Sequence, residues 1–113
     1  GTSLGDPSEV RALNSAFKRW EPKANSIAIG SVKANIGHLL SSAGIASFIK
    51  LVLALNNKIM PPNVNLSELN PSIKFHKTPF YTIQEAKKWE VSKDVTRRAS
   101  VNSFGFGGTN NRI

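Results

Sequence analysis

Hydrophobic and polar positions divide the chain into one long apolar segment and several short ones. The long segment runs from Leu39 to Leu55, and Lys50 is its one charged residue. Apolar residues nearly all round a helix predict that it is buried on most sides. Small side chains fill its first turns, so we expect another helix to approach closely there.

Shorter patterns predict a helix before this segment and strands around it. The run Asp6-Pro7-Ser8-Glu9 is typical of a helix start, with Asp6 as the cap and Pro7 in the first helical position. This amphipathic helix should end before Pro22. Strands are expected at 26–32, 80–83 and 98–104, a returning strand at 109–113, and an ordered loop at 63–78. The pattern predicts an α/β fold with a central buried helix packed on a short mixed sheet.

Composition narrows the possible functions. The chain has 113 residues, enough for one domain with a modest core. It has no cysteine, which excludes disulfides, thiolate metal sites and a thiol nucleophile on this chain. A net charge of +8 favours acidic partners such as nucleic acid, an anionic membrane or an acidic protein. The basic residues are spread along the chain in singles and pairs, which indicates a diffuse basic face.

Membrane and export signals are not expected from the pattern. The segment 39–55 is short and rich in serine, so we do not expect a membrane span. The first residues do not show a basic stretch followed by an apolar one, so no signal peptide is expected and the cytoplasm is the default location.

Three motifs follow one another along the chain. They are Gly1-Thr2-Ser3-Leu4-Gly5-Asp6-Pro7, Lys33-Ala34-Asn35-Ile36-Gly37-His38, and Asn102-Ser103-Phe104-Gly105-Phe106-Gly107-Gly108-Thr109-Asn110. With these motifs in this order, the chain resembles the C-terminal part of a β-ketoacyl synthase, in particular the ketosynthase domains of modular polyketide synthases. The resemblance covers residues 1–113 and implies a thiolase-like α/β fold, of which this chain would be an incomplete C-terminal portion.

The resemblance also implies which catalytic groups lie elsewhere. The family's nucleophilic cysteine belongs to its N-terminal half, and a first catalytic histidine would stand just before Gly1. At the other end, Asn111-Arg112-Ile113 departs from the family's usual continuation. We therefore expect a fragment of a larger enzyme that is inactive by itself.

The reaction implied by the resemblance is a decarboxylative Claisen condensation. An enzyme-bound acyl thioester is joined to a malonyl-type unit carried on the phosphopantetheine of an acyl carrier protein, in polyketide or fatty acid biosynthesis. No bound cofactor and no metal site are implied. The implied partners are the acyl carrier protein, the rest of the ketosynthase domain and a second copy in a homodimer, with neither nucleic acid nor membrane.

Two residues are candidates for catalysis. His38 would begin the central helix, where the helix dipole disfavours imidazolium and leaves a neutral ring with one N–H to donate. Such a donor could stabilise negative charge on the extender's thioester oxygen; a structural histidine in a cap or core is the alternative. By resemblance, Lys33 belongs to the catalytic set and orders the site's carboxylates and water, with a solvated lysine at a strand end as the alternative.

Four further residues are candidates for substrate binding by resemblance. Thr2 would bond to the phosphopantetheine arm, and Phe106 would gate entry of the acyl chain. Asn35 and Gly107 stand in the same motifs. For Phe106 the alternative is a core aromatic in a tight turn, and for Thr2 an unordered chain end.

Two other classes of protein are alternatives. The Gly-rich turn at 105–108 is loosely similar to a phosphate loop, but no Gly-Lys-Ser/Thr and no helical pattern follow it. A small basic α/β module that binds nucleic acid or an acidic protein is the second alternative. It is supported by charge alone, because aromatic residues do not alternate with basic ones on any expected strand.

Overall fold

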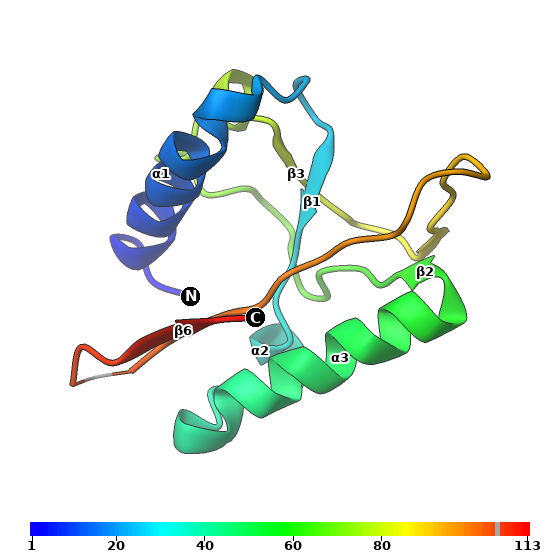
Figure 1. Ribbon diagram of the computed structural model, residues 1–113. Coiled ribbons are helices and arrows are strands. Elements are labelled where there is room, and N and C mark those ends of the chain that lie inside the picture. Colours follow the sequence, from blue (N-terminus) through cyan, green and yellow to red (C-terminus); the bar gives the residue numbers. More distant parts are fainter. Residues whose placement is uncertain (106) are drawn as a thin grey trace.

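The computed structural model describes residues 1–105 and 107–113 of the chain (Figure 1). The helices are α1 (Gly5–Phe17), α2 (Lys33–Ile36) and α3 (Ala43–Asn57), with 3-10 turns η1 (Lys18–Trp20), η2 (Leu40–Ser42) and η3 (Phe75–Lys77). The strands are β1 (Ile27–Ile29), β2 (Ile59–Met60), β3 (Phe80–Thr82), β4 (Lys87–Lys88), β5 (Asn102–Phe104) and β6 (Asn110–Arg112). The mixture of helices and strands agrees with the predicted α/β class.

The strands form three separate pairs among the described residues, where one short mixed sheet was expected. β1 lies parallel to β3, with Ile27 opposite Phe80. β2 pairs with β4 and β5 with β6, both antiparallel. A parallel pair needs a long crossover connection, and here it contains α2 and α3. β2 and β4 were missed because two residues are too few to show a periodic pattern.

The start of α1 differs from the prediction, which placed the cap at Asp6. The helix begins at Gly5, so Asp6 lies inside the first turn. Thr2 Oγ1 accepts a hydrogen bond of 2.8 Å from the amide of Gly5, and the Asp6 carboxylate accepts one of 3.3 Å from the amide of Thr2. The residue at the N-cap is Leu4, which makes no side-chain capping bond. The predicted end before Pro22 is confirmed.

The core of this chain is small and is formed by residues of α1, α3 and β3 and of the segment after β3. Its buried hydrophobic residues are Val10, Ala54, Phe80 and Ile83. The ring of Phe17 meets that of Phe80 edge-on, with centroids 5.9 Å apart. α1 is thus the predicted amphipathic helix, and its apolar side, with Val10 and Phe17, packs toward β3.

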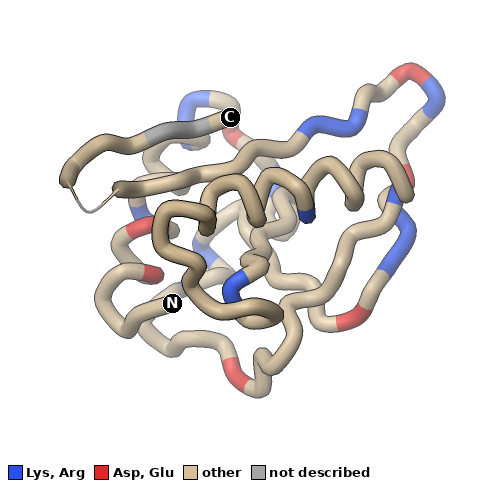
Figure 2. The backbone as a smooth tube through the Cα atoms, turned by 90° about the horizontal axis from the view of Figure 1, so that it is seen from below, with Lys and Arg blue, Asp and Glu red and all other residues tan. Residues whose placement is uncertain are grey.

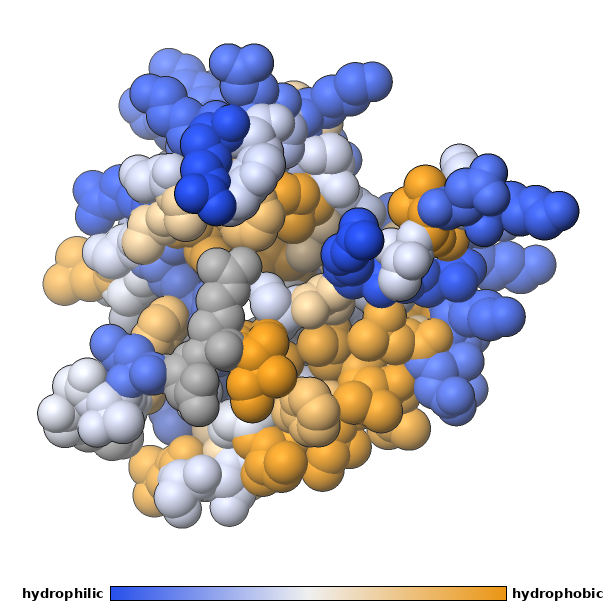
Figure 3. All heavy atoms as spheres, in the orientation of Figure 1, coloured by the Kyte–Doolittle hydropathy of each residue, from blue (hydrophilic) through white to orange (hydrophobic). Residues whose placement is uncertain are grey.

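α3 is not buried on most sides within this chain, contrary to the prediction. Ile49 is 52% exposed and Leu53 is 55% exposed, and only Ala54 of the helix is buried. Figure 3 shows the resulting apolar surface over α3. The short strand pairs cover too little of the helix to enclose it, so Ile45, Ile49, Val52 and Leu53 are exposed within the described residues.

The expectation about membrane spans also needs correction. Helical turns continue from η2 into α3, so the apolar run Leu40–Asn57 reaches 18 residues. By length and composition alone that is enough to cross a membrane, although a core helix of a soluble protein meets the same requirement.

The small residues at the start of α3 face a strand, where a second helix was expected. A Cβ on Gly44 would lie 2.8 Å from Ser103 Oγ in β5. This close approach packs the β5–β6 hairpin against the first turns of α3 (Figure 1).

Candidate functional site

The second motif folds into a compact turn between β1 and α3. Lys33 and Asn35 lie in α2, and Gly37 ends it with a positive φ of 74°, a conformation that favours glycine. His38 follows and lies before η2, so it does not begin the central helix as predicted. The motif therefore brings Lys33, Asn35 and His38 together, but on a separate turn ahead of α3.

A local hydrogen bond sets the state of the His38 ring. Its Nδ1 atom accepts a bond of 3.0 Å from the backbone amide of Leu40. A nitrogen that accepts a hydrogen bond has no proton of its own, so the neutral ring has its proton on Nε2. The ring is thus held by a local hydrogen bond from the Leu40 amide, and the role of His38 as a donor stays a prediction.

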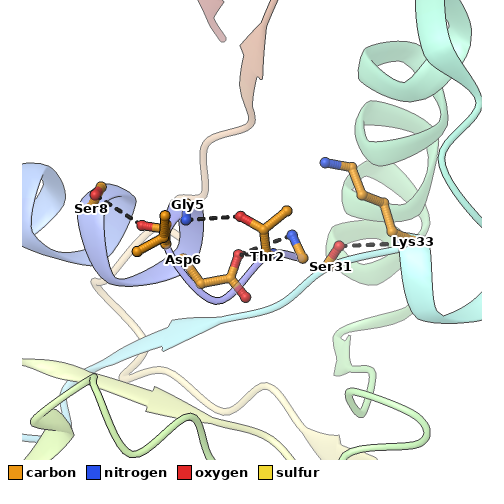
Figure 4. Close-up of polar contacts among 8 residues, drawn as sticks. Thr2, Gly5, Asp6, Ser8, Ser31 and Lys33 are labelled. Carbon is orange, nitrogen blue, oxygen red and sulfur yellow. Dashed lines mark hydrogen bonds and ion pairs between the residues drawn. The ribbon is translucent and has the colours of Figure 1, made fainter.

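The backbone leading into α2 is fixed at Ser31. The Oγ atom of Ser31 accepts a bond of 3.2 Å from the amide of Lys33, which joins the residue to the first turn of α2 (Figure 4). The amide of Ser31 donates to Asn63 Oδ1 at 3.0 Å, and Asn63 Nδ2 donates to the carbonyl of Ile29 at 3.0 Å. The Asn63 carboxamide thus forms hydrogen bonds with the residues on both sides of Gly30.

Lys50 bonds to the same segment from α3. Its Nζ atom lies 3.0 Å from the carbonyl oxygen of Ser31 and 3.3 Å from Asn35 Oδ1. Burial among the apolar side chains lowers the pKa of Lys50 below its ordinary value of 10.5. Asn35, predicted to bind substrate, therefore uses its carbonyl oxygen within the protein.

Sequence reasoning gave Lys50 and Asn63 no role. The available signal for Lys50 was its position as the one charge in an apolar helix. Asn63 follows Pro61 and Pro62 in a stretch that has no period, so no local pattern marks it.

The remaining predicted residues lie on other elements. Thr2 uses its hydroxyl oxygen at the start of α1, and the Lys33 side chain is exposed. Gly107 lies in the turn between β5 and β6, where an added Cβ would meet nothing within 4 Å. Phe106 lies outside the described residues.

Two neighbouring glycines have a clear structural reason. A Cβ on Gly105 would lie 2.7 Å from the carbonyl oxygen of Thr109, and Gly108 has a positive φ of 82°. The Gly-rich motif is therefore a tight hairpin turn, and the requirement for glycine falls at 105 and 108 rather than at 107.

Metal chemistry has no obvious ligand set in the described part of the chain. No three His, Asp or Glu side chains gather there closely enough to hold an ion. The groups available for chemistry are hydrogen-bond donors and cations, namely the imidazole of His38 and the ammonium of Lys33.

Comparison with known proteins identifies relatives of the whole chain. Polyketide synthase PksN of Bacillus subtilis (strain 168) is 47% identical over 110 residues, which are 97% of this chain and 2% of PksN. A solved ketosynthase from module 6 of the bacillaene synthase of Bacillus subtilis 168 is 42% identical with a TM-score of 0.94. Ketosynthase twelve of the bacillaene polyketide synthase in Bacillus amyloliquefaciens is also 42% identical, with a TM-score of 0.93.

The match to each of these two structures covers 99% of this chain and 20% of the solved chain, so this chain spans a fifth of their length. The thiolase-like fold of a ketosynthase C-terminal portion is thereby confirmed. The family model described as Beta-ketoacyl synthase, C-terminal domain matches residues 1–67. The chain therefore belongs to the β-ketoacyl synthase family, as the C-terminal part of a ketosynthase domain of the kind found in polyketide synthases.

Proposed function

We propose that residues 1–113 are the C-terminal portion of a ketosynthase domain that catalyses decarboxylative Claisen condensation. The substrates are an acyl thioester on the domain's cysteine and a malonyl-type unit on the phosphopantetheine of an acyl carrier protein. The observation that carries the proposal is the hydrogen bond from the Leu40 amide to His38 Nδ1, which makes Nε2–H the donor of a neutral ring.

The chemistry requires such a donor. When the malonyl carboxylate leaves as carbon dioxide, the electron pair of the broken C–C bond moves into the thioester and places negative charge on its oxygen. The Nε2–H of His38 stabilises that oxygen. The enolate carbon then attacks the acyl group, the C–S bond to the cysteine breaks, and a thiolate leaves. This cysteine lies outside the 113 residues, which contain none.

The other motif residues take supporting roles in this proposal. Lys33 contributes a positive charge next to the site, and Asn35 keeps its amide protons for substrate while its oxygen bonds to Lys50. The Thr2 hydroxyl accepts from Gly5 and still has a proton to donate to the phosphopantetheine arm. By resemblance, Phe106 gates entry of the acyl chain, and Gly107 belongs to the same motif and takes part in substrate binding.

The partners follow from the same proposal. The apolar side of α3, which includes Ile49 and Leu53, is covered by the rest of the ketosynthase domain. The intact domain is a homodimer in the cytoplasm, it receives its extender from an acyl carrier protein, and it requires no bound cofactor.

The test is reconstitution of the intact domain with a short acyl thioester and a malonyl carrier protein. The proposal predicts a β-ketoacyl product and carbon dioxide in equal amounts. Acylation of the cysteine without either product would contradict it.

A basic binding module is the alternative function. Figure 2 shows the Lys and Arg positions spread along several parts of the chain. Retention on heparin that persists through a salt series would favour this alternative. Loss of retention at modest salt would favour the ketosynthase.

A further inference from the structure

We infer that Lys50 and Asn63 are positioning residues that clamp the segment between β1 and His38, and thereby fix the imidazole that acts in the condensation. This inference rests on the proposed function. Neither residue belongs to the three motifs, and both reach the segment from elements distant in sequence.

Both side chains bind to the backbone of Ser31. All three polar atoms of this residue are engaged: its amide donates to Asn63, its carbonyl accepts from Lys50, and its hydroxyl oxygen accepts from the amide of Lys33. A residue held at three atoms loses the freedom to rotate about its backbone angles. Because α2 starts two residues later, this fixes the direction in which the motif leaves β1.

Asn63 is itself held firmly. Its backbone amide donates to the carbonyl of Ile83, beyond the end of β3, at 2.7 Å. A Cβ on Gly30 would lie 3.3 Å from Asn63 Oδ1, a tight contact for any other residue. Asn63 thus joins the end of β1, through its carboxamide, to Ile83 beyond the end of β3, through its backbone amide.

Lys50 connects α3 with α2. Its ammonium bonds to Ser31 O and to Asn35 Oδ1, so it contacts residues on both sides of the start of α2. Lys50 lies among apolar residues of a groove between α2 and α3, with Ile36, Ile49 and Leu53. An apolar side chain would suit this position better unless the two hydrogen bonds are needed. These two hydrogen bonds hold α2 in position against α3, which accounts for a lysine at position 50.

The consequence for catalysis is geometric. His38 follows α2 directly, so a shift of α2 against α3 moves the imidazole and weakens the bond from Leu40. Displacement of a catalytic group by about 1 Å can lower a rate by about 10²-fold. We expect the clamp to act on the decarboxylation step and not on the transfer of the acyl group to the cysteine.

The experiment compares Lys50→Met and Asn63→Leu with matched controls in the intact ketosynthase domain. The controls are Lys58→Met, which removes a charge at the far end of α3, and Asn56→Leu, on an exposed position of the same helix. Three properties are measured: kcat and KM for decarboxylation of a malonyl carrier protein, acylation of the cysteine by mass spectrometry, and ¹⁵N chemical shifts of the labelled His38 ring.

The clamp predicts that Lys50→Met and Asn63→Leu lower kcat by up to about 10²-fold while KM and acylation stay unchanged. The ¹⁵N spectrum should change from one Nε2–H tautomer to a mixture. The two control variants should match the wild type in all three measurements.

Equal losses of acylation and decarboxylation would overturn the inference, because they indicate a general structural role. Retention of the single tautomer in both variants would overturn it as well. If the wild type shows no decarboxylation, the proposed function fails, and the ring spectrum still decides whether the clamp holds His38.

Discussion

The Nδ1 atom of His38 accepts a 3.0 Å hydrogen bond from the amide of Leu40, and Leu40 presents that amide from a left-handed backbone with φ of 49°. This conformation costs a residue with a Cβ about 1–2 kcal/mol. The Leu40 side chain is 68% exposed, so burial does not offset the cost. Backbone strain therefore lies next to the candidate catalytic histidine, as is common at functional sites.

Replacement of Leu40 by glycine tests this strain. Leu40→Gly should stabilise the ketosynthase domain relative to Leu40→Ala by about 1 kcal/mol, because glycine adopts a positive φ without the Cβ clash and alanine does not. Urea unfolding of the two variants measures the difference. Both keep the amide that donates to His38, so both should retain decarboxylation. A Leu40→Ala variant more stable than Leu40→Gly would show that the left-handed backbone is not strained.

The lowered pKa of Lys50 predicts a pH dependence of stability. Burial makes the folded protein bind this proton less tightly than the unfolded chain, whose lysine titrates near 10.5. Between the two pKa values the unfolded chain has more protons bound, so the free energy of unfolding rises with pH in that window. Below the lowered pKa, Lys50 is charged in both states and the full cost of burying the charge applies.

The measurement is urea unfolding of the wild type and Lys50→Met from neutral pH up to 10.5. The stability of the wild type relative to Lys50→Met should increase as the pH rises. A difference that stays constant, or falls, contradicts the burial of this ammonium.

The 113-residue chain alone should not condense or decarboxylate acyl thioesters. It contains no cysteine to hold the acyl group, and it would supply only one of the two histidines that the family uses. Assay of the purified chain with malonyl carrier protein checks this, with the His38→Ala chain as background. Turnover above that background would mean that the 113 residues hold a complete site.

Exposure of α3 predicts self-association of the isolated chain. Ile49 and Leu53 are each more than half exposed, and burial of such a side chain contributes about 1.5–3 kcal/mol. Replacement of both by glutamine should reduce association in analytical ultracentrifugation and reduce binding of a hydrophobic dye. Leu4→Gln is the control, since Leu4 is exposed at the start of α1. A wild-type chain that is monomeric and does not bind the dye would contradict the prediction.

Local patterns predicted the elements better than their packing. The spacing of Val10 and Phe17 correctly indicated the inner side of α1. The apolar run of α3 suggested a buried helix, because composition records what a helix can bury and does not show which partner covers it.

The candidate site was predicted in part. Motif resemblance selected Lys33, Asn35 and His38, and the structure places them on one turn. The neutral donor at His38 was predicted from a position at the start of the central helix, but His38 lies before η2 and its ring accepts a bond from the Leu40 amide; its role as a donor stays a prediction. The contacts of Asn63 join residues 32 and 34 positions apart in sequence, and no local pattern reports a hydrogen bond over that distance.

The most direct test of the account is replacement of His38 in the intact ketosynthase domain, with His76→Ala as the matched control. His76 is the other histidine of the chain and lies exposed in η3. Acylation of the cysteine is followed by mass spectrometry, and decarboxylation of the malonyl carrier by release of carbon dioxide. The account predicts that His38→Ala lowers decarboxylation by about 10²–10³-fold and leaves acylation nearly unchanged, while His76→Ala affects neither. An equal loss in both steps for His38→Ala, or no loss in either, would contradict the assignment of His38 as the donor to the enolate oxygen.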